Sequence, residues 1–278
     1  MKVFCACAPG LEPFLAAELR ALGLEARPTP GGADAEGEDA VAIACLGSRL
    51  ADAVKLRTAS GSRDAAGAPL FRRGWRARVG AAPLRESLAA GLLAAAGYDG
   101  SQPFLDPMCG SGTIAIEAAS LAARRAPGLG RTFAFETWPG HDPARTARLR
   151  ARLEATPRAP PAAVHASDRN QGALRLAQKN ASAAGLAEAI RFARTDAADA
   201  TVPAGRGVLV TNPPYGDRLA DAEPAWRALG QLLARLTGWT AVVLAPTRRL
   251  EALLEVAPAS ETPVRNGGLR CRILVYRL

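Results

Sequence analysis

The sequence contains no run of about 18 consecutive apolar residues, so it offers no candidate for a membrane-spanning helix. Its first apolar stretch is interrupted by Pro9 and Gly10 before the hydrophobic segment of a secretory signal can form. Hydrophobic residues make up 49% of the chain and charged residues 22%, which is enough for a sizeable core and excludes a disordered chain. We therefore expect a soluble, cytoplasmic protein without a membrane partner.

Cysteine and histidine are too few and too scattered for a metal site. The 5 cysteines include one pair with a single residue between them, Cys5 and Cys7, but no second ligand pair. The 2 histidines, His141 and His165, stand alone. We expect no bound metal, and we interpret the cysteines as reduced and mostly buried.

Lysine is almost absent, whereas arginine is abundant. Of 35 basic residues, only Lys2, Lys55 and Lys179 are lysines, and the formal net charge is +9. A GC-rich genome would explain arginine in general. It does not explain the uneven distribution, which is −2 over residues 1–60 and +11 over the rest. Because the arginine fork suits phosphate, the charge favours a nucleic-acid partner.

The first sixty residues alternate short apolar runs with helical patterns. We predict strands at Val3–Cys7 and Val41–Cys45, helices at Leu11–Leu22 and Leu46–Leu56, and a turn or hairpin between Pro28 and Asp39. This β-α-β-β-α succession suggests a small α+β domain of ferredoxin-like type at residues 1–60. A basic linker is predicted at residues 61–82.

From residue 83 to residue 278 the pattern is α/β. Predicted strands and helices alternate, which is typical of a doubly wound parallel sheet with helices on both faces. A Pro- and Arg-rich insertion, Pro127–Pro161, interrupts this pattern and is expected to be helical at residues 144–155. The chain is expected to end in a β-hairpin, Thr262–Arg265 with Arg270–Leu278. The other predicted strands are Phe104–Asp106, Ala163–Asp168, Ile190–Asp196, Val208–Asn212 and Thr240–Ala245, and the predicted helices are Pro83–Ala96, Thr113–Arg125, Asn170–Ala184 and Ala222–Leu236.

The first chemical motif runs from Asp106 to Thr113 and lies between a predicted strand and a predicted helix. Its glycines permit a tight turn and close approach of a ligand to the backbone. It has neither the third glycine of a dinucleotide fingerprint nor the lysine of a P-loop. A carboxylate at the strand end repels pyrophosphate but suits a cationic ligand, so S-adenosylmethionine fits better than NAD. The candidate cofactor-binding residues of this loop are Asp106, Pro107, Cys109, Gly110, Ser111, Gly112 and Thr113.

Two further acids end later strands. Asp168 is placed to bind ribose hydroxyls, and Asp196, followed by Ala197, to reach an adenine amino group. Each acid alone is more often a helix cap than a ligand. Three acids at the ends of three successive strands favour a cofactor site, because ligands bind at that edge of such sheets.

The most specific motif is Asn212-Pro213-Pro214-Tyr215, directly after a predicted buried strand. Two prolines fix the backbone and leave no N–H donors, so carbonyl oxygens are exposed. The Asn212 side-chain oxygen and the Pro213 carbonyl can accept both hydrogens of one planar amino group, which directs its nitrogen toward a methyl donor. Tyr215 offers a flat face on which a flipped-out base can stack. We predict that these four residues are catalytic.

The motifs resemble those of the bacterial ribosomal RNA guanine-N2 methyltransferases that act on the large-subunit (23S) RNA. The resemblance covers residues 70–278 well and residues 1–58 more loosely. It implies a class I methyltransferase fold with S-adenosylmethionine as donor and N2-methylguanosine as product, after an N-terminal ferredoxin-like domain. Besides the motifs above, the matching segments are Arg73–Arg76, Ala82–Ser87, Arg125–Leu129, Asn212–Leu219 and Arg265–Leu269.

The sequence lacks one feature of the family that it resembles. Its members usually carry an RNA-binding THUMP module between the ferredoxin-like segment and the catalytic domain, whereas here only about a dozen residues separate the two. The basic stretch that follows residue 70 is a candidate substitute for phosphate contact, with a solvated linker as the equal alternative. The candidate RNA-binding residues in it are Arg72, Arg73, Trp75, Arg76 and Arg78.

Other functions remain open. The substrate can be tRNA rather than 23S RNA, and loops of this type also serve adenine-N6 methylation and glutamine-N5 methylation of release factors. The basic charge disfavours a protein substrate, and the flanking matches disfavour DNA. A non-catalytic RNA-binding assembly factor is a third possibility, against which the intact motifs argue. The sequence predicts no oligomeric state.

Overall fold

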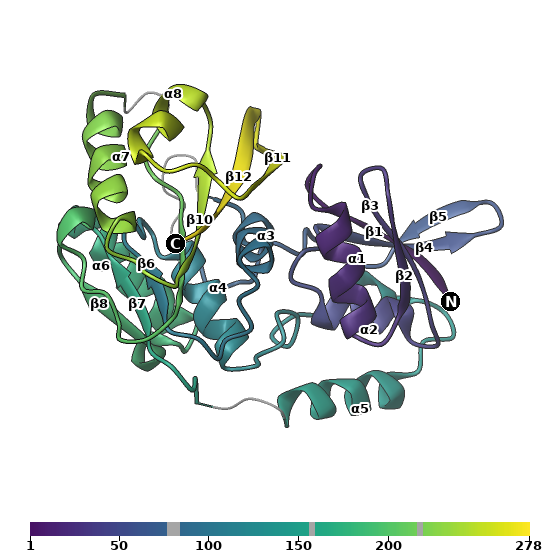
Figure 1. The fold of residues 1–278 in the computed structure, drawn as a ribbon. Coiled ribbons are helices and arrows are strands. Elements are labelled where there is room, and N and C mark those ends of the chain that lie inside the picture. The colour runs from purple at the N-terminus through teal and green to yellow at the C-terminus, as the bar shows by residue number, and fades with distance from the viewer. Residues whose placement is uncertain (77–83, 156–158, 216–218) are drawn as a thin grey trace. The chain divides into compact units, whose positions relative to one another are not determined.

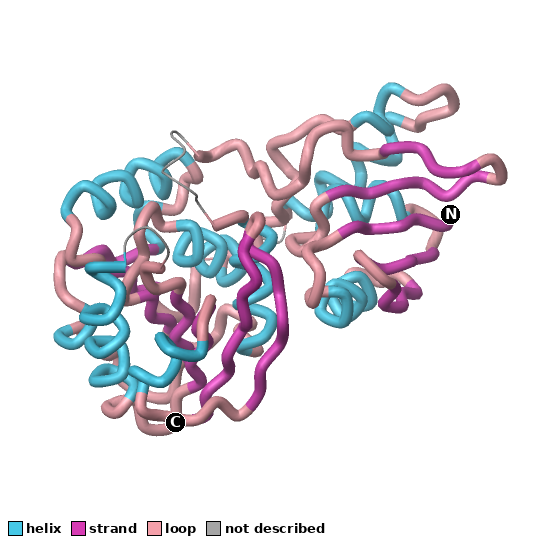
Figure 2. The backbone as a smooth tube through the Cα atoms, turned by 90° about the horizontal axis from the view of Figure 1, so that it is seen from above, coloured by secondary structure: helices cyan, strands magenta, loops and turns pink. Residues whose placement is uncertain are grey.

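The computed structural model describes residues 1–76, 84–155, 159–215 and 219–278. The chain divides into two compact units. Unit 1 comprises Met1–Gly74, Arg85–Gly91 and Ala123–Arg158, and unit 2 comprises Trp75–Leu84, Leu92–Ala122 and Ala159–Leu278. Each unit contains one β-sheet, seen as two separate sets of magenta strands in Figure 2. Among the described residues, no helix has the length and apolar character needed to cross a membrane.

Unit 1 contains a five-stranded antiparallel sheet in the order β2-β3-β1-β4-β5. Alternate residues of the central strand, Val3 and Cys5, are fully buried, and Cys5 lies opposite Ala33 and Val54. The ferredoxin-like arrangement predicted for this part of the chain is confirmed. Its elements are β1 (Lys2–Ala6), α1 (Glu12–Ala21), β2 (Glu25–Thr29), β3 (Gly32–Glu36), α2 (Ala40–Gly47), β4 (Ala53–Thr58) and β5 (Gly61–Asp64).

Two predicted elements of unit 1 are wrong. Val41–Cys45, predicted as a strand, lies in helix α2, and the segment Leu46–Leu56, predicted as a helix, contains strand β4. A short apolar run does not distinguish a buried strand from a buried helix. Here α2 is buried over most of its surface, so no amphipathic period marks it.

The stretch after residue 58 is more ordered than a linker. Residues Gly61–Asp64 form β5 on β4, and Ala65, Ala66 and Leu70 are buried. The Arg131 guanidinium joins this stretch to the Arg-rich insertion, since it donates hydrogen bonds to four carbonyl oxygens between residues 68 and 72. The insertion itself contains η1 (Ala134–Thr137) and α5 (Pro143–Glu154), which confirms the helix predicted there. Domain boundaries at residues 60 and 82 remain a prediction.

Unit 2 contains a seven-stranded sheet in the order β11-β12-β10-β9-β6-β7-β8. The five strands from β10 to β8 are parallel, and β12 and β11 are antiparallel (Figure 1). This sheet confirms the predicted doubly wound fold and its C-terminal hairpin. The strands are β6 (Phe104–Asp106), β7 (Val164–Ser167), β8 (Ile190–Ala193), β9 (Val208–Thr211), β10 (Thr240–Ala245), β11 (Ser260–Asn266) and β12 (Leu269–Arg277).

Helices connect the parallel strands, and their ends fall within a few residues of the predicted ones. Helix α3 contributes residues to both units. The helical elements are α3 (Glu86–Ala96), α4 (Thr113–Ala122), α6 (Gln171–Ala183), η2 (Ala187–Ala189), η3 (Ala197–Asp199), α7 (Leu219–Leu233), α8 (Arg248–Glu251) and η5 (Ala252–Leu254).

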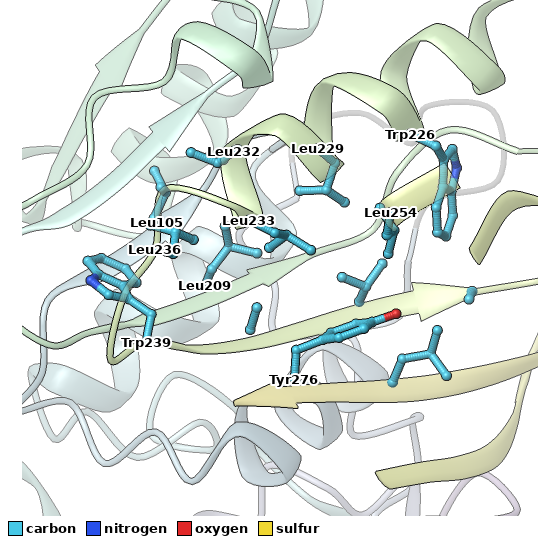
Figure 3. Close-up of a cluster of buried hydrophobic side chains, with 14 of the residues drawn as sticks. Leu105, Leu209, Trp226, Leu229, Leu232, Leu233, Leu236, Trp239, Leu254 and Tyr276 are labelled. Atoms are coloured by element: carbon cyan, nitrogen blue, oxygen red, sulfur yellow. The ribbon is translucent and has the colours of Figure 1, made fainter. Parts of the chain in front are cut away.

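The core of unit 2 lies between helix α7 and one face of the sheet (Figure 3). Leu105 of β6 and Leu209 of β9 belong there to the same buried cluster as Trp226 and Leu229 of α7. Phe104, the neighbour of Leu105, points to the opposite face and contacts Tyr98 with ring centroids 5.0 Å apart. Both faces of β6 are therefore packed, which holds its carboxyl end in a defined position.

The substitution Leu229→Ala should destabilise unit 2 by about 2–5 kcal/mol, because this fully buried side chain leaves a cavity in the core. Chemical unfolding followed by tryptophan fluorescence measures the effect, since Trp226 and Trp239 belong to the same cluster. Leu269→Ala is the matched control: Leu269 is 51% exposed, so its loss should cost less than about 0.5 kcal/mol. Equal losses in the two variants would contradict this assignment of the core.

Candidate functional site

The candidate site is built at the point where the strand order of the unit 2 sheet reverses. Strand β6 pairs with β7 on one side and with β9 on the other, and all three are parallel. Their carboxyl ends therefore meet at one edge, where ligands bind in sheets of this kind. Asp106 ends β6, Asp168 follows β7, and Asn212 follows β9.

Asp106 is the most deeply buried acid of this edge, with 1% of its surface exposed. Its Oδ1 accepts hydrogen bonds from the Thr211 hydroxyl at 3.0 Å and from the Met108 N–H at 3.4 Å. Its Oδ2 is buried and has no hydrogen-bond partner among the described residues. Burial raises the pKa of Asp106 to about 7 although both hydrogen bonds oppose the shift, and the nearby Asp168 adds to it. Such a carboxyl group is poised to receive a positively charged donor.

The loop between β6 and α4 is held by hydrogen bonds to neighbouring elements. The N–H of Cys109 donates to the carbonyl of Ser167 at 2.9 Å, and the Asn180 amide donates to the Ser111 carbonyl at 3.0 Å. Pro107 is buried, and so is the Cys109 thiol, whose pKa burial raises. The Cys109 side chain packs within the loop, and a contact of Cys109 with a cofactor stays a prediction.

The two glycines of this loop are required by its conformation. Gly110 and Gly112 have φ angles of +53° and +85°, a region that other residues rarely adopt. At Gly112 a Cβ atom would also lie 3.0 Å from the Cβ of Ala177 in α6. A larger residue here would push α6 away from the loop.

The other two predicted acids bond to backbone N–H groups. Asp168 accepts from Gly110 at 2.9 Å and from Asn170 at 2.8 Å, so it ties the glycine loop to the start of α6. Asp196 caps η3 by accepting from Ala198 at 3.2 Å, and Ala197 is buried. Asp168 and Asp196 are each only half-buried. A carboxylate has more acceptor sites than these bonds use, so a role toward a ligand stays open for both.

The Asn212–Tyr215 loop is fixed at three points. Before it, the Thr211 hydroxyl is bonded to Asp106. The Trp226 indole N–H donates to the Pro214 carbonyl at 3.1 Å, and the Asn266 amide donates to the Tyr215 hydroxyl at 2.5 Å. Of the polar atoms that remain, Asn212 Oδ1 is buried and has no hydrogen-bond partner among the described residues.

Sequence reasoning missed the residues that hold this loop. Thr211 could have been noticed, because it directly precedes the motif. Asn266 lies in the Arg265–Leu269 segment. The sequence of this segment is similar to that of the methyltransferase family, but no role was predicted for it. Trp226 carries no sequence signal, since it lies on helix α7 and only the packing of α7 on the sheet brings its indole to the loop.

The predicted RNA-binding segment is used largely for internal contacts. Arg73 donates to the carbonyls of Leu70 and Arg49, both at 2.6 Å. Arg76 stacks on Trp75 and donates to the Leu84 carbonyl and to the Thr113 hydroxyl at 3.0 and 3.3 Å. Arg72 is exposed, and Arg78 lies outside the described residues. An RNA contact by these residues stays a prediction. Arg72 is the best placed of the described arginines for such a contact, because its side chain is exposed.

The cysteines are all free and buried, as expected. Among the residues that the structure describes, no group of three or more His, Cys, Asp or Glu side chains lies together where it could hold a metal ion.

Two family models match the chain. The RlmL ferredoxin-like domain matches residues 2–55, and the RMKL-like methyltransferase domain matches residues 73–274. The chain is 42% identical over 227 residues to the ribosomal RNA large subunit methyltransferase K/L of Vibrio campbellii, and 40% identical to that of Vibrio parahaemolyticus. These alignments take in 77% of this chain but 32% of each relative, so the chain spans about a third of the curated relatives it matches.

Solved structures are similar over the whole chain. SMU.472, described as a candidate methyltransferase in complex with SAH, superposes with a TM-score of 0.89 at 23% identity, over 99% of this chain and 97% of that one. TrmN from Thermus thermophilus superposes with a TM-score of 0.68 at 21% identity, over 100% and 99% of the two chains. At these identities the likeness confirms the fold.

The raised pKa of Asp106 predicts how stability depends on pH. Between about pH 4 and pH 7 the folded protein keeps this proton while the unfolded chain has lost it. The free energy of unfolding therefore falls as pH rises through that window. Asp106→Asn keeps an acceptor for Thr211 but carries no charge, so the variant should gain stability over wild type as pH rises.

Chemical unfolding of the ligand-free protein below and above this window measures the difference. Asp199→Asn, an exposed acid of η3, is the matched control and should follow wild type. A stability difference between Asp106→Asn and wild type that does not change with pH would contradict the titration of Asp106.

Proposed function

Because the chain belongs to the family of RMKL-like methyltransferase domains, we propose that it transfers a methyl group from S-adenosylmethionine to the exocyclic N2 of a guanosine in 23S ribosomal RNA. The relatives named ribosomal RNA large subunit methyltransferase K/L support this RNA as the substrate. The excess of positive charge after residue 60 agrees with an RNA partner. Such a substrate also suits the cytoplasmic location predicted from the sequence.

The observation that carries the proposal is a pair of buried acceptor atoms without partners among the described residues, at the ends of neighbouring strands. They are Oδ2 of Asp106, after β6, and Oδ1 of Asn212, after β9. A buried acceptor left unpaired costs free energy, so proteins rarely keep one unless a ligand or water satisfies it. Two such acceptor atoms lie where the strand order of one sheet reverses. We infer that two neighbouring hydrogen-bond donors satisfy them, the ammonium group of the cofactor and the amino group of the base.

The residues of the glycine loop fit the methyl donor. S-adenosylmethionine supplies a methyl group on a positively charged sulfonium. We propose that Asp106 binds its ammonium group, that Asp168 holds the ribose hydroxyls, and that Asp196 with Ala197 contacts the adenine. The buried Ser167 hydroxyl, also without a partner among the described residues, is a further contact at the same edge.

Asn212 and Pro213 fit the acceptor base. With Pro214 bonded to Trp226, the Pro213 carbonyl and Asn212 Oδ1 are left to accept the two amino hydrogens of guanine. That arrangement concentrates the nitrogen lone pair on one side and makes a strong general base unnecessary. Tyr215, held through its hydroxyl by Asn266, presents its ring for stacking. The rate gain comes from positioning and polarisation.

Asp106→Asn should weaken binding of S-adenosylmethionine about tenfold or more, because a charge-assisted hydrogen bond contributes about 1.5–3 kcal/mol. Isothermal titration calorimetry of the purified protein measures the affinity. The same variant is expected to be more stable than wild type above neutral pH, so weaker binding cannot be ascribed to misfolding. Asp199→Asn is again the control, and wild-type affinity in Asp106→Asn would remove this carboxyl group from the site.

Asn212→Ala should slow methyl transfer about a hundredfold or more, as the loss of one preorganised hydrogen bond does. The measurement is single-turnover transfer from radiolabelled S-adenosylmethionine to an unmodified transcript of large-subunit ribosomal RNA. Cofactor affinity should be unchanged. Gln178→Ala, which removes an exposed amide from α6, is the matched control.

Mass spectrometry of the nucleosides identifies the product of that reaction. N2-methylguanosine is expected. Methylated adenosine would overturn the substrate assignment, and undiminished transfer by Asn212→Ala would overturn the role of the Asn212–Tyr215 loop.

A further inference from the structure

The tip of the β11–β12 hairpin carries two arginines that lie directly opposite each other. Arg265 of β11 pairs with Arg270 of β12, next to the turn at Gly267 and Gly268. Both side chains are exposed, and neither forms an ion pair with any residue that the structure describes. Like charges at directly opposed positions destabilise a β-sheet. A negatively charged partner that binds both arginines would offset the repulsion between them.

The rest of the hairpin shows that carboxylates are available to arginine in this part of the fold. Arg272, two residues beyond Arg270, binds Glu251 at 2.6 Å and Glu261 at 2.8 Å. Arg248 shares Glu261 at 3.1 Å. Arg272 is therefore neutralised within the body of the hairpin, whereas the described residues offer no carboxylate to the two arginines at its tip.

The tip is also tied to the Asn212–Tyr215 loop. Asn266, adjacent to Arg265, donates its amide hydrogen to the Tyr215 hydroxyl at 2.5 Å. Directly across from Asn266 lies Leu269, which is 51% exposed and is one of two large hydrophobic side chains that stand exposed among the described residues. Because side chains alternate along a strand, the side chains of Asn266 and Leu269 project from one side of the hairpin. Those of Arg265 and Arg270 project from the other side.

We propose that this hairpin tip is a second RNA-contacting surface, in which Arg265 and Arg270 bind phosphates beside the target guanosine and Leu269 enters the base stack. The proposal rests on the proposed function. A base buried against Tyr215 must leave its stack, which opens a gap beside it. Apolar side chains such as leucine fill gaps of this kind, and arginine binds the neighbouring phosphates. Leu269 lies on the side of the hairpin that faces Tyr215, as this role requires.

The first test is the salt dependence of binding to an unmodified transcript of large-subunit ribosomal RNA. In Arg265→Gln/Arg270→Gln the slope of log affinity against log salt should fall by about 0.7–0.9 for each phosphate that is no longer bound. Affinity for S-adenosylmethionine should not change. The matched control is Arg175→Gln/Arg191→Gln, which removes the same charge from two arginines of α6 and of β8, the strand at the opposite edge of the sheet.

The second test concerns Leu269. Leu269→Ala should slow single-turnover methyl transfer about tenfold while RNA and cofactor affinities stay near wild type, because insertion acts after the RNA is bound. Leu269→Met, which keeps the apolar bulk, should restore the rate. Since Leu269 is exposed, neither variant should change the stability of the protein.

Several outcomes would overturn the proposal. An unchanged salt slope in the hairpin double variant, or an equal decrease in the control, would remove the arginines from the RNA surface. A change of oligomeric state in Leu269→Ala, measured by sedimentation with methyl transfer intact, would assign the tip to a protein contact. Wild-type protein that neither binds nor methylates the transcript would instead overturn the proposed function, and the hairpin proposal with it.

Discussion

The buried carboxyl group of Asp106 is the constraint on which the rest of the site depends. It ends β6, the middle one of the five parallel strands, and its hydrogen bond to Thr211 joins β6 to β9 at the point where the strand order reverses. That one bond connects the glycine loop to the Asn212–Tyr215 loop. The same burial raises the pKa of Asp106 and leaves its second oxygen without a partner among the described residues, which costs stability. The site thus keeps a buried and incompletely hydrogen-bonded carboxyl group, which would only destabilise a purely structural hydrophobic core.

Rigidity at this site comes from the hydrophobic core beneath it. Met108 and Tyr215, one from each loop, pack against the cluster that includes Trp226 and Leu229. Trp226 is part of the core and also holds the loop, since its ring is fully buried and its indole N–H donates to the Pro214 carbonyl. Pro213 and Pro214 have no backbone N–H group and cannot donate the usual hydrogen bonds, so this loop needs such support. Core packing and the position of the Asn212–Tyr215 loop are therefore one and the same requirement.

Arginine has two different uses in this chain. In unit 1 the guanidinium groups of Arg73, Arg131 and Arg150 donate mainly to backbone carbonyls, and Arg131 ties the Arg-rich insertion to the stretch after residue 64. A guanidinium carries five donors in a fixed fork and can join several carbonyls at once. At the hairpin tip of unit 2, by contrast, Arg265 and Arg270 are exposed. Net charge counts both uses equally, so it cannot locate a nucleic-acid surface.

The amino-acid sequence by itself determined the fold class, the strand ends that carry Asp106, Asp168 and Asn212, and the family to which the chain belongs. These follow from local patterns: an apolar run, a turn residue and a motif next to one another in the chain. It failed at residues 41–56, where a short apolar run has no period that separates helix from strand. Only the tertiary structure decided that Trp226 and Asn266 hold the Asn212–Tyr215 loop, that Asp106 is buried, and that Arg131 serves packing. Each of these depends on contacts between residues far apart in sequence, and no local pattern encodes which distant side chain fills a given position.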